Sequence, residues 1–291
     1  MRDRNSKDFY LKNWPLLVKL LRVDKTYCVH HGYYEKGIRN HIQSILNMND
    51  FVGRLLEIDS NDKQTKKILD AGCGIGGTAI YLAKKYPNIN FTGITDVSKH
   101  IKMAKILAKE NNVIFNTDFI LMDFINTSFP SNQFDAIYLL ESSCYAYNKE
   151  ILLHEMYRIL KPRGILVIID VFLTNVQLSP FLKNFYVWFC KGWGLTNLIK
   201  LAEFKNFLKI EDFQNIETRD LTKNVMRTIL RGDVLSIPYL FSTMFKRIIQ
   251  GKNYQIEKDS KFLGIVPVLT TILGIKKGIS YNAIIAIKKN I

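Results

Sequence analysis

A glycine loop that follows a carboxylate is the part of this sequence best suited to bind a ligand. Residues 68–77 read Ile-Leu-Asp-Ala-Gly-Cys-Gly-Ile-Gly-Gly, so a short apolar run leads into the loop. Glycine has no Cβ and tolerates positive φ, which lets the backbone of such a loop approach a ligand closely. The segment from Thr78 to Tyr86 is expected to form a helix that Pro87 ends. Strand, loop and helix in this order predict a cradle for a nucleotide cofactor.

The loop by itself fits two classes of cofactor. Gly72, Gly74 and Gly77 satisfy the Gly-x-Gly-x-x-Gly pattern of dinucleotide binders, and the same loop fits S-adenosylmethionine. Asp70 favours the second class, because a carboxylate attracts the ammonium group of a methionine and repels a pyrophosphate. A nicotinamide-dependent oxidoreductase remains the alternative from another class, and a cofactor-binding scaffold without turnover is a third.

The segment from Lys67 to Phe172 alternates short apolar runs with helical periods. This alternation is typical of a parallel sheet that helices cover on both faces. The strands expected here are Lys67–Asp70, Asn90–Ile94, Phe119–Met122, Phe134–Leu140 and Ile165–Val171. Two closing strands are expected at Asn215–Leu221 and Tyr281–Lys288. The sequence therefore predicts one α/β core.

The segments on either side of this core are expected to cover its ligand. We divide the chain into an N-terminal helical arm or lid at 1–50, a cofactor-binding core at 51–175, and cap helices with the closing strands at 176–291. Aromatic residues are dense between Phe181 and Trp193, either as ordinary helix packing or as the wall of an apolar pocket. The apolar run Phe262–Ile275 is open to three interpretations: core, pocket entrance or membrane contact.

Composition narrows the class of protein. The chain has 291 residues, 47 % of them hydrophobic, and a net charge of +15, with lysines spread along its whole length. We interpret the charge as a basic surface and expect no nucleic-acid partner, while contact with a membrane surface stays open. The four cysteines have no paired spacing, which favours a reducing, cytoplasmic location. The His30-His31 doublet has no third partner by sequence, so no metal is expected.

With these motifs in view, the chain resembles the class I S-adenosylmethionine-dependent methyltransferases over residues 67–172. The likeness is carried by the glycine loop, the acid after the third strand and the Leu160-Lys161-Pro162-x-Gly164 turn. A narrower likeness, to the gamma-tocopherol and sterol methyltransferase group, is carried by His-His-Gly-Tyr-Tyr-Glu at 30–35, Gly-Ile-Thr at 93–95 and Glu-Ser-Ser-Cys at 141–144. The resemblance implies a Rossmann-like fold with a seven-stranded, mostly parallel sheet, helices on both faces and a helical, aromatic substrate cap.

The resemblance also implies a set of cofactor contacts. Asp70 and the loop would surround the methionine, Thr95 or Asp96 the ribose, and Asp123 and Phe124 the adenine, with Tyr33 as a lid. His100 stands where the group usually has Gln. The expected cofactor-binding residues are Tyr33, Asp70, Gly72, Cys73, Gly74, Gly76, Thr95, Asp96, His100, Asp123, Phe124 and Glu141.

Methyl transfer from a sulfonium is an in-line displacement, so an enzyme mainly aligns the two reactants, excludes water and removes a proton where the acceptor has one to lose. The expected catalytic residues are Glu141, Tyr145, His31 and Tyr34, with Glu35 as a further candidate base. Burial is expected to raise the pKa of Glu141. Tyr145 stands where related sequences often have His.

The sequence thus predicts methyl transfer to a hydrophobic small molecule, most plausibly isoprenoid or lipid-like, with C-methylation or a prenyl diphosphate as options. The alternative is an O- or N-methyltransferase of a small natural product, sugar or amine. The acceptor, the methylated atom and the oligomeric state stay open.

Overall fold

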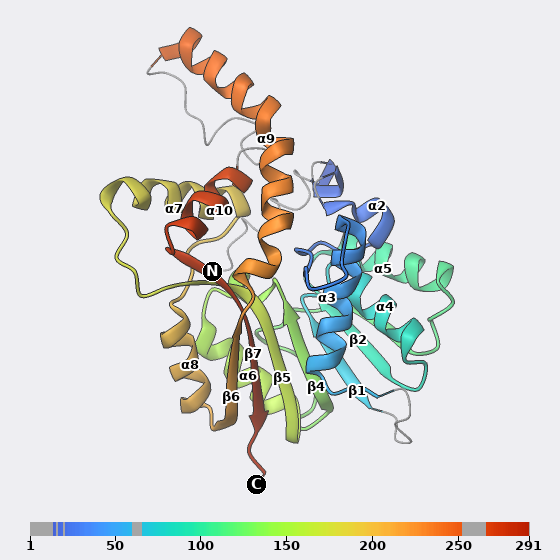
Figure 1. Cartoon of the computed structure of the whole chain (residues 1–291). Coiled ribbons are helices and arrows are strands. Elements are labelled where there is room, and N and C mark those ends of the chain that lie inside the picture. The colour runs from blue at the N-terminus through green and yellow to red at the C-terminus, as the bar shows by residue number, and fades with distance from the viewer. Residues whose placement is uncertain (1–13, 16, 20, 60–65, 252–265, 291) are drawn as a thin grey trace.

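A seven-stranded sheet forms the centre of the protein (Figure 1). The computed structural model describes residues 14–15, 17–19, 21–59, 66–251 and 266–290. The strands follow the order β3-β2-β1-β4-β5-β7-β6. Their bounds are β1 Lys67–Ala71, β2 Asn90–Thr95, β3 Thr117–Leu121, β4 Phe134–Leu140, β5 Leu160–Leu173, β6 Phe213–Asp220 and β7 Ile279–Lys288. The first five strands pair in parallel and β7 runs antiparallel to both neighbours, which confirms the predicted mostly parallel sheet.

Helices cover both faces of this sheet, as the sequence pattern predicted. On one face α3 (His41–Leu55), α4 (Gly77–Lys85) and α5 (Ser98–Glu110) bury their apolar sides against the strands. On the other face α6 (Lys149–Ile159) and α8 (Leu201–Ile210) do the same. Because β1, β4 and β5 are covered on both sides, they are apolar along most of their length rather than alternating, whereas β3 at the edge of the sheet buries only Phe119.

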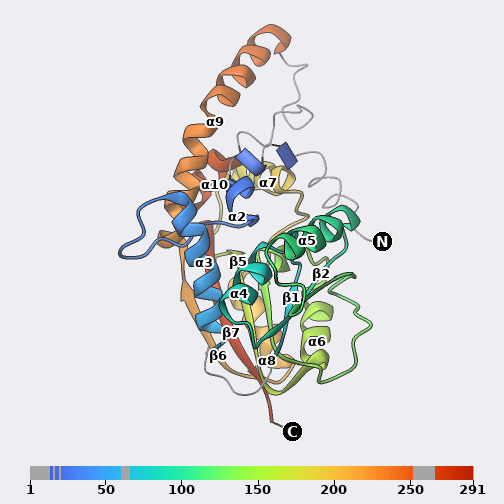
Figure 2. The same cartoon turned by 90° about the vertical axis from the view of Figure 1, so that its right-hand side faces the viewer.

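A helical cap lies over the carboxyl ends of the parallel strands (Figures 1 and 2). It consists of α7 (Pro180–Trp193), α9 (Thr222–Gln250) and α10 (Val266–Ile275), together with the short helix α2 (Val23–Thr26) of the arm. α10 packs against both α7 and α9. A separate cluster of buried apolar side chains joins the arm, the cap and the sheet. This arrangement encloses the edge of the sheet where ligands bind in parallel α/β folds.

The structure corrects three details of the sequence interpretation. The expected domain limit at residue 50 falls inside α3, which packs into the core. The Lys161-Pro162-x-Gly164 turn is a bulge within β5: Phe134 pairs with Leu160 and Ala136 with Ile165, so extra residues lie on β5 alone. Strand β6 begins two residues earlier than expected.

The structure describes part of the apolar run 262–275. Residues 262–265 lie outside the described residues, whereas 266–275 form α10 and pack as core, with Val266 and Leu273 fully buried. In the part of the chain that the structure describes, none of the helices has the length and apolar character needed to cross a bilayer.

Candidate active site

The glycine loop closes tightly around neighbouring strand ends. Gly72 has φ +97°, and a Cβ placed there would lie 2.3 Å from Cβ of Ser142 at the end of β4. Gly76 has φ +83°, and its missing Cβ makes room for the Phe119 ring of β3. Gly74, at φ +53°, has no neighbour within 4 Å of its ideal Cβ. Two glycines therefore serve close packing, and Gly74 keeps the open position that an approaching ligand needs.

Asp70 is buried beneath this loop. It is 4 % exposed and pairs in register with Tyr138 of β4. Burial raises the pKa of Asp70 to about 7, because the charged form is poorly solvated there. A buried carboxylate gains most from a cationic partner, so its place at the loop fits the expected ammonium group of a methionine.

A second buried group, His30, supplies positive charge near Asp70. Its Nδ1 lies 2.9 Å from the carbonyl oxygen of His31, and its Nε2 lies 3.0 Å from Oδ1 of Asn49 on α3. Both partners are acceptors, so both ring nitrogens donate. Burial alone would lower the pKa of His30, but the Cys28 sulfur and the Glu141 carboxylate outweigh it and raise the pKa to about 9. The two acceptors and the direction of this shift favour a protonated His30, a structural role that the sequence analysis did not assign.

The residues expected around the ribose lie at the end of β2. Thr95 is buried, and its Oγ1 accepts a hydrogen bond from the Val97 amide at 3.4 Å. Asp96 is only half-buried, so its carboxylate is the more accessible of the two. His100 is buried beside Trp14 of the arm at 5.4 Å between ring centroids, and burial lowers its pKa to about 4. This placement favours Asp96 for a hydroxyl contact and a neutral His100.

The residues expected around the adenine lie at the end of β3. Asp123 accepts a hydrogen bond from the Ile125 amide at 3.2 Å and caps a turn there. The Phe124 ring reaches to 3.7 Å from the ideal Cβ position of Gly72, so it borders the glycine loop. Cys73 is buried, and burial raises the pKa of its thiol far above the ordinary value. Tyr33 stacks on Phe51 of α3, with their ring centroids 4.4 Å apart.

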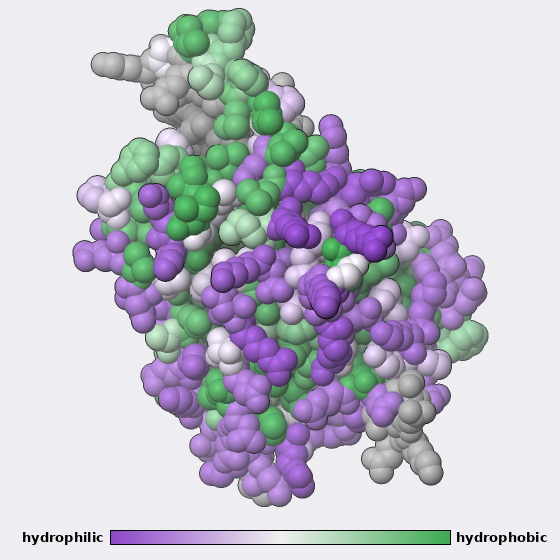
Figure 3. Space-filling view, viewed as in Figure 1, coloured by the Kyte–Doolittle hydropathy of each residue, from purple (hydrophilic) through white to green (hydrophobic). Residues whose placement is uncertain are grey.

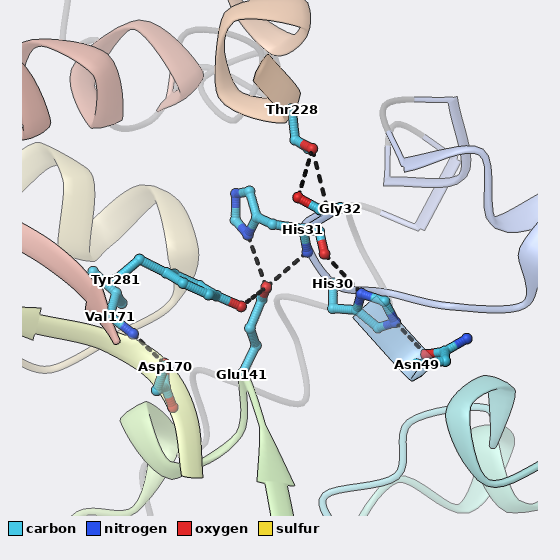
Figure 4. Close-up of polar contacts among 9 residues, drawn as sticks. All are labelled: His30, His31, Gly32, Asn49, Glu141, Asp170, Val171, Thr228 and Tyr281. Carbon is cyan, nitrogen blue, oxygen red and sulfur yellow. Dashed lines mark hydrogen bonds and ion pairs between the residues drawn. The ribbon is translucent and has the colours of Figure 1, made fainter. Parts of the chain in front are cut away.

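Glu141 is the centre of a hydrogen-bonded cluster at the end of β4 (Figure 4). Its Oε1 accepts three hydrogen bonds: from the His31 amide at 2.7 Å, from Nδ1 of the same residue at 2.9 Å, and from the Tyr281 hydroxyl at 2.5 Å. The backbone of Glu141 has φ +51°, a conformation that is rare for a residue with a side chain. Arm, β4 and β7 thus meet at a single carboxylate oxygen.

The prediction that burial raises the pKa of Glu141 is wrong. Desolvation does act in that direction, but the charge and hydrogen bond of His31, with the smaller contributions of His30 and Tyr281, outweigh it and lower the pKa below 4.5. The Tyr281 hydroxyl shows the opposite effect, because burial and the adjacent carboxylate raise its pKa far above 10. Glu141 is therefore a carboxylate at neutral pH.

A pocket lies between this cluster and the cap. Most of its lining is apolar, with the polar groups of His31, Glu141 and Tyr281 on one side. The other lining residues are Leu17, Leu21, Val29, Cys144, Tyr145, Asp170, Val171, Phe189, Trp193, Leu195, Thr222, Val225, Met226, Ile229, Thr270, Gly274, Ile279 and Ser280. None of them is a lysine or an arginine. Glu141 adjoins Ser142, which contacts Gly72, so the pocket borders the glycine loop.

The aromatic stretch of α7 divides between the two roles considered for it. Phe189 and Trp193 line the pocket, and the Trp193 ring meets His31 at 6.2 Å. Trp188 instead packs against Phe185, outside the pocket lining. Tyr145 lines the pocket and donates a hydrogen bond to the Trp193 carbonyl at 3.1 Å, which joins the turn after β4 to the cap.

Two of the candidate catalytic residues lie apart from this cluster. The guanidinium of Arg227 on α9 lies over the Tyr34 ring, 5.5 Å from the centroid of that ring. Glu35 is exposed and forms an ion pair with Arg54 at 3.2 Å. Neither residue lines the pocket. The chain turns away from the pocket after Gly32, where the Thr228 hydroxyl of α9 accepts a hydrogen bond from the Gly32 amide.

Tyr281 and Asp170 are the pocket residues that sequence reasoning missed. Asp170 of β5 accepts hydrogen bonds from the Ser143 hydroxyl and the Cys144 amide at 2.6 and 2.8 Å, and so fixes the segment after Glu141. Tyr281 is the first residue of an expected strand. At a strand end, the alternation of apolar and polar residues does not show which face of the sheet the side chain occupies. A buried acid in an apolar strand was the available signal for Asp170.

The fold is that of the class I methyltransferases. Comparison with protein families agrees, since residues 69–168 match the family described as "Methyltransferase domain". The match agrees with the predicted likeness to S-adenosylmethionine-dependent methyltransferases and gives no support to the nicotinamide alternative.

Curated relatives include the predicted sterol and tocopherol group. A sterol 24-C-methyltransferase of Aspergillus fumigatus is 29 % identical over 55 % of this chain and 42 % of its own length. Norajmaline N-methyltransferase of Rauvolfia serpentina is 29 % identical over 67 % and 70 %, and tocopherol O-methyltransferase of Arabidopsis thaliana is 26 % identical over 68 % and 60 %. The chain spans about half the length of the sterol enzymes that it matches.

Solved structures share the fold across almost the whole chain. A cyclopropane synthase of Mycobacterium tuberculosis has a TM-score of 0.76 at 15 % identity, covering 97 % of this chain and 98 % of that one. Geranyl diphosphate C-methyltransferase of Streptomyces coelicolor A3(2) has a TM-score of 0.68 at 16 % identity, covering 94 % and 92 %. At these identities the likeness establishes the class I fold, cap included.

Proposed function

We propose that this protein transfers a methyl group from S-adenosylmethionine to a hydrophobic small molecule, of isoprenoid or lipid-like character, that carries no phosphate. The observation that carries the proposal is the apolar pocket that meets a single carboxylate cluster beside the glycine loop. The relatives that act on sterols and tocopherol support an apolar acceptor.

The residues at the carboxyl edge fit the cofactor. Gly74 leaves open space, the buried Asp70 suits the ammonium group, and Asp96, Asp123 and Phe124 lie in line toward β3 for the ribose and adenine. When bound, S-adenosylmethionine supplies the electrophilic methyl group. The protein contributes alignment of the acceptor and exclusion of water by the cap.

Glu141 is the residue best placed to move a proton. His31 and Tyr281 donate to its Oε1, and none of the described residues donates to Oε2. Oε2 would therefore accept the proton that the acceptor releases. His31 and Tyr281 hold the carboxylate in place and keep it ionised, so it is ready as a base at neutral pH.

The charge of the pocket argues against a prenyl diphosphate. Such a group would meet Glu141 and Asp170, while the described lining offers no lysine or arginine to bind it. The described residues also hold no cluster of three or more metal-binding side chains that could place a bridging cation. The lining residues do not distinguish a hydroxyl, an amine or an alkene carbon, and the norajmaline N-methyltransferase among the relatives keeps nitrogen as a second candidate acceptor.

We further propose a reducing compartment such as the cytoplasm, since Cys28, Cys73, Cys144 and Cys190 are all buried as free thiols.

Calorimetric titration with S-adenosylhomocysteine tests the cofactor site. We expect micromolar binding by the wild-type chain and none of comparable strength for reduced nicotinamide cofactor. Release of S-adenosylhomocysteine from S-adenosylmethionine in the presence of trial isoprenoid, phenolic and amine acceptors then tests turnover. A folded sample that gives no heat would overturn the proposal.

A further inference from the structure

The outer part of α9 carries apolar side chains that the described fold leaves uncovered. Near Gly232 the helix packs on α10, where the Thr271 hydroxyl donates to Asp233 at 2.7 Å. Beyond Pro238 it extends away from the body of the protein (Figures 1 and 2). Eight large apolar side chains of this helix are 46–78 % exposed, namely Leu230, Val234, Ile237, Phe241, Met244, Phe245, Ile248 and Ile249.

The width of this apolar surface indicates what covers it. Several of the side chains recur at steps of three and four, which by itself would suit one partner helix. Phe245 and Ile249 lie beside Met244 and Ile248 and widen the stripe beyond a coiled-coil seam. Phe181 and Val187 of α7, which packs against α10 as α9 does, are also exposed, at 68 % and 47 %. Figure 3 shows apolar side chains gathered over both helices. A broad apolar area suits a lipid surface better than a narrow helical groove.

The charge of the same helices is complementary to anionic lipid. α7 contains two lysines and no acid, and α9 contains five basic residues and one acid. That acid, Asp233, accepts the Thr271 hydroxyl at the α10 contact, away from the outer turns. Basic side chains next to an apolar helix are the composition of segments that lie in the interface of an anionic membrane.

The acceptor pocket lies directly under these helices. Val225, Met226 and Ile229 on the inner turns of α9 line it, as do Phe189 and Trp193 of α7. A second, smaller pocket between His31, Gly232 and Pro267 extends the space toward the junction of α9 and α10. A molecule that leaves a bilayer at the cap would therefore have a short apolar path to Glu141.

We propose that residues 237–250 of α9, with Phe181 and Val187 of α7, dock on an anionic lipid membrane, and that the cap receives its hydrophobic acceptor from that surface. The docking rests on the exposed side chains and charge alone, and the delivery of the acceptor rests on the function proposed above.

The test is sedimentation of the full chain with phosphatidylcholine vesicles, with and without phosphatidylserine. We expect binding that phosphatidylserine strengthens and salt weakens, because part of the attraction is between exposed charges. The variant Phe241→Asp with Ile248→Asp should bind at least about 10-fold more weakly, since two apolar side chains lose their burial in lipid. Phe115→Asp is the matched control: Phe115 is 91 % exposed between α5 and β3, at the end of the sheet opposite the cap, and its replacement should leave binding unchanged.

Three results would overturn the docking proposal: no vesicle binding by the wild-type chain, equal binding by the double variant, or equal loss in the Phe115 control. Sedimentation velocity on the same samples detects the competing occupant. A wild-type dimer that the double variant converts to monomer, without vesicle binding, would assign the surface to a second copy. Titration with S-adenosylhomocysteine is scored separately, so failure of the methyltransferase proposal is distinguishable from failure of the docking.

Discussion

The carboxyl edge of β1 to β4, where the cofactor is proposed to bind (the cofactor edge), and the proposed acceptor pocket both border the Glu141 carboxylate. The two regions are built in opposite ways. At the cofactor edge, short runs of consecutive residues end four adjacent strands, from Asp123 on β3 to Glu141 on β4. The acceptor pocket draws its lining from Leu17 to Tyr281, and the hydrogen bonds that His31 and Tyr281 donate to Glu141 join residues 110 and 140 positions apart. Backbone geometry defines the first region, and side chains brought together by the cap define the second. Substitutions should accordingly act on the first through backbone fit and on the second through individual side chains.

The largest effect is expected at the cofactor edge, from Gly72→Ala. The new Cβ would lie 2.3 Å from Cβ of Ser142 and would require φ +97°, so we expect no measurable heat with S-adenosylhomocysteine and a loss of stability of about 2 kcal/mol or more. Gly37→Ala is the matched control, with φ +95° and no neighbour within 4 Å. It should cost about 1 kcal/mol and keep cofactor affinity. Equal affinity in both variants would show that the loop does not touch the cofactor.

Where the two regions meet, Glu141→Gln should lower kcat by about 100-fold or more, because the base is lost while the cofactor contacts remain. Calorimetry should show unchanged affinity for S-adenosylhomocysteine. A variant that keeps full kcat would reduce Glu141 to a positioning residue.

Tyr281→Phe gives a finer readout at the same place. Removing this hydrogen bond raises the pKa of Glu141, which in the wild-type chain lies below 4.5. The acid limb of the pH–kcat profile should therefore move to higher pH in this variant. An unmoved limb together with lower kcat would indicate a merely structural role for Tyr281.

In the acceptor pocket, Trp193→Ala should raise the acceptor KM by about 10-fold, through lost apolar contact, and leave cofactor affinity unchanged. Trp188→Ala is the control, because Trp188 lies on the same helix but outside the pocket lining. Steady-state kinetics with any accepted substrate separates the two. Equal KM values in both variants would contradict the assigned pocket wall.

The smallest effect concerns stability. The pKa of Asp70 is raised to about 7 from 3.8, so the stability associated with its proton is complete below pH 3.8 and is lost as pH rises through 7. Asp70→Asn should therefore raise Tm by about 5 °C at pH 8 and change it little near pH 4. Thermal melts of the cofactor-free chain check this. The same variant should bind S-adenosylhomocysteine less tightly; a Tm gain without that loss would leave Asp70 with no cofactor role.

The cofactor edge could be predicted from the sequence because each of its parts is local. Asp70, the glycines and the acids after β2 and β3 lie next to strand ends, and topology then places neighbouring ends together. The strands themselves were predictable from apolar runs, except at β5, where an internal bulge resembles a turn.

The pocket could be predicted only in part. Glu141, His31 and Tyr145 were expected on separate segments, but nothing local indicated that Tyr281 would complete the cluster or that Tyr34 would turn toward Arg227. The pKa of Glu141 was also mispredicted, because burial is a property of one residue whereas the opposing hydrogen bonds depend on tertiary contacts.

The left-handed backbone of Glu141 places function and stability in opposition. At φ +51° a residue with a Cβ is less stable than glycine by about 1 kcal/mol. Glu141→Gly would relieve that cost and would delete the carboxylate on which arm, β4 and β7 converge. A selection for thermostability alone would therefore drift toward an inactive protein at this position, and one that includes turnover would retain the strained residue.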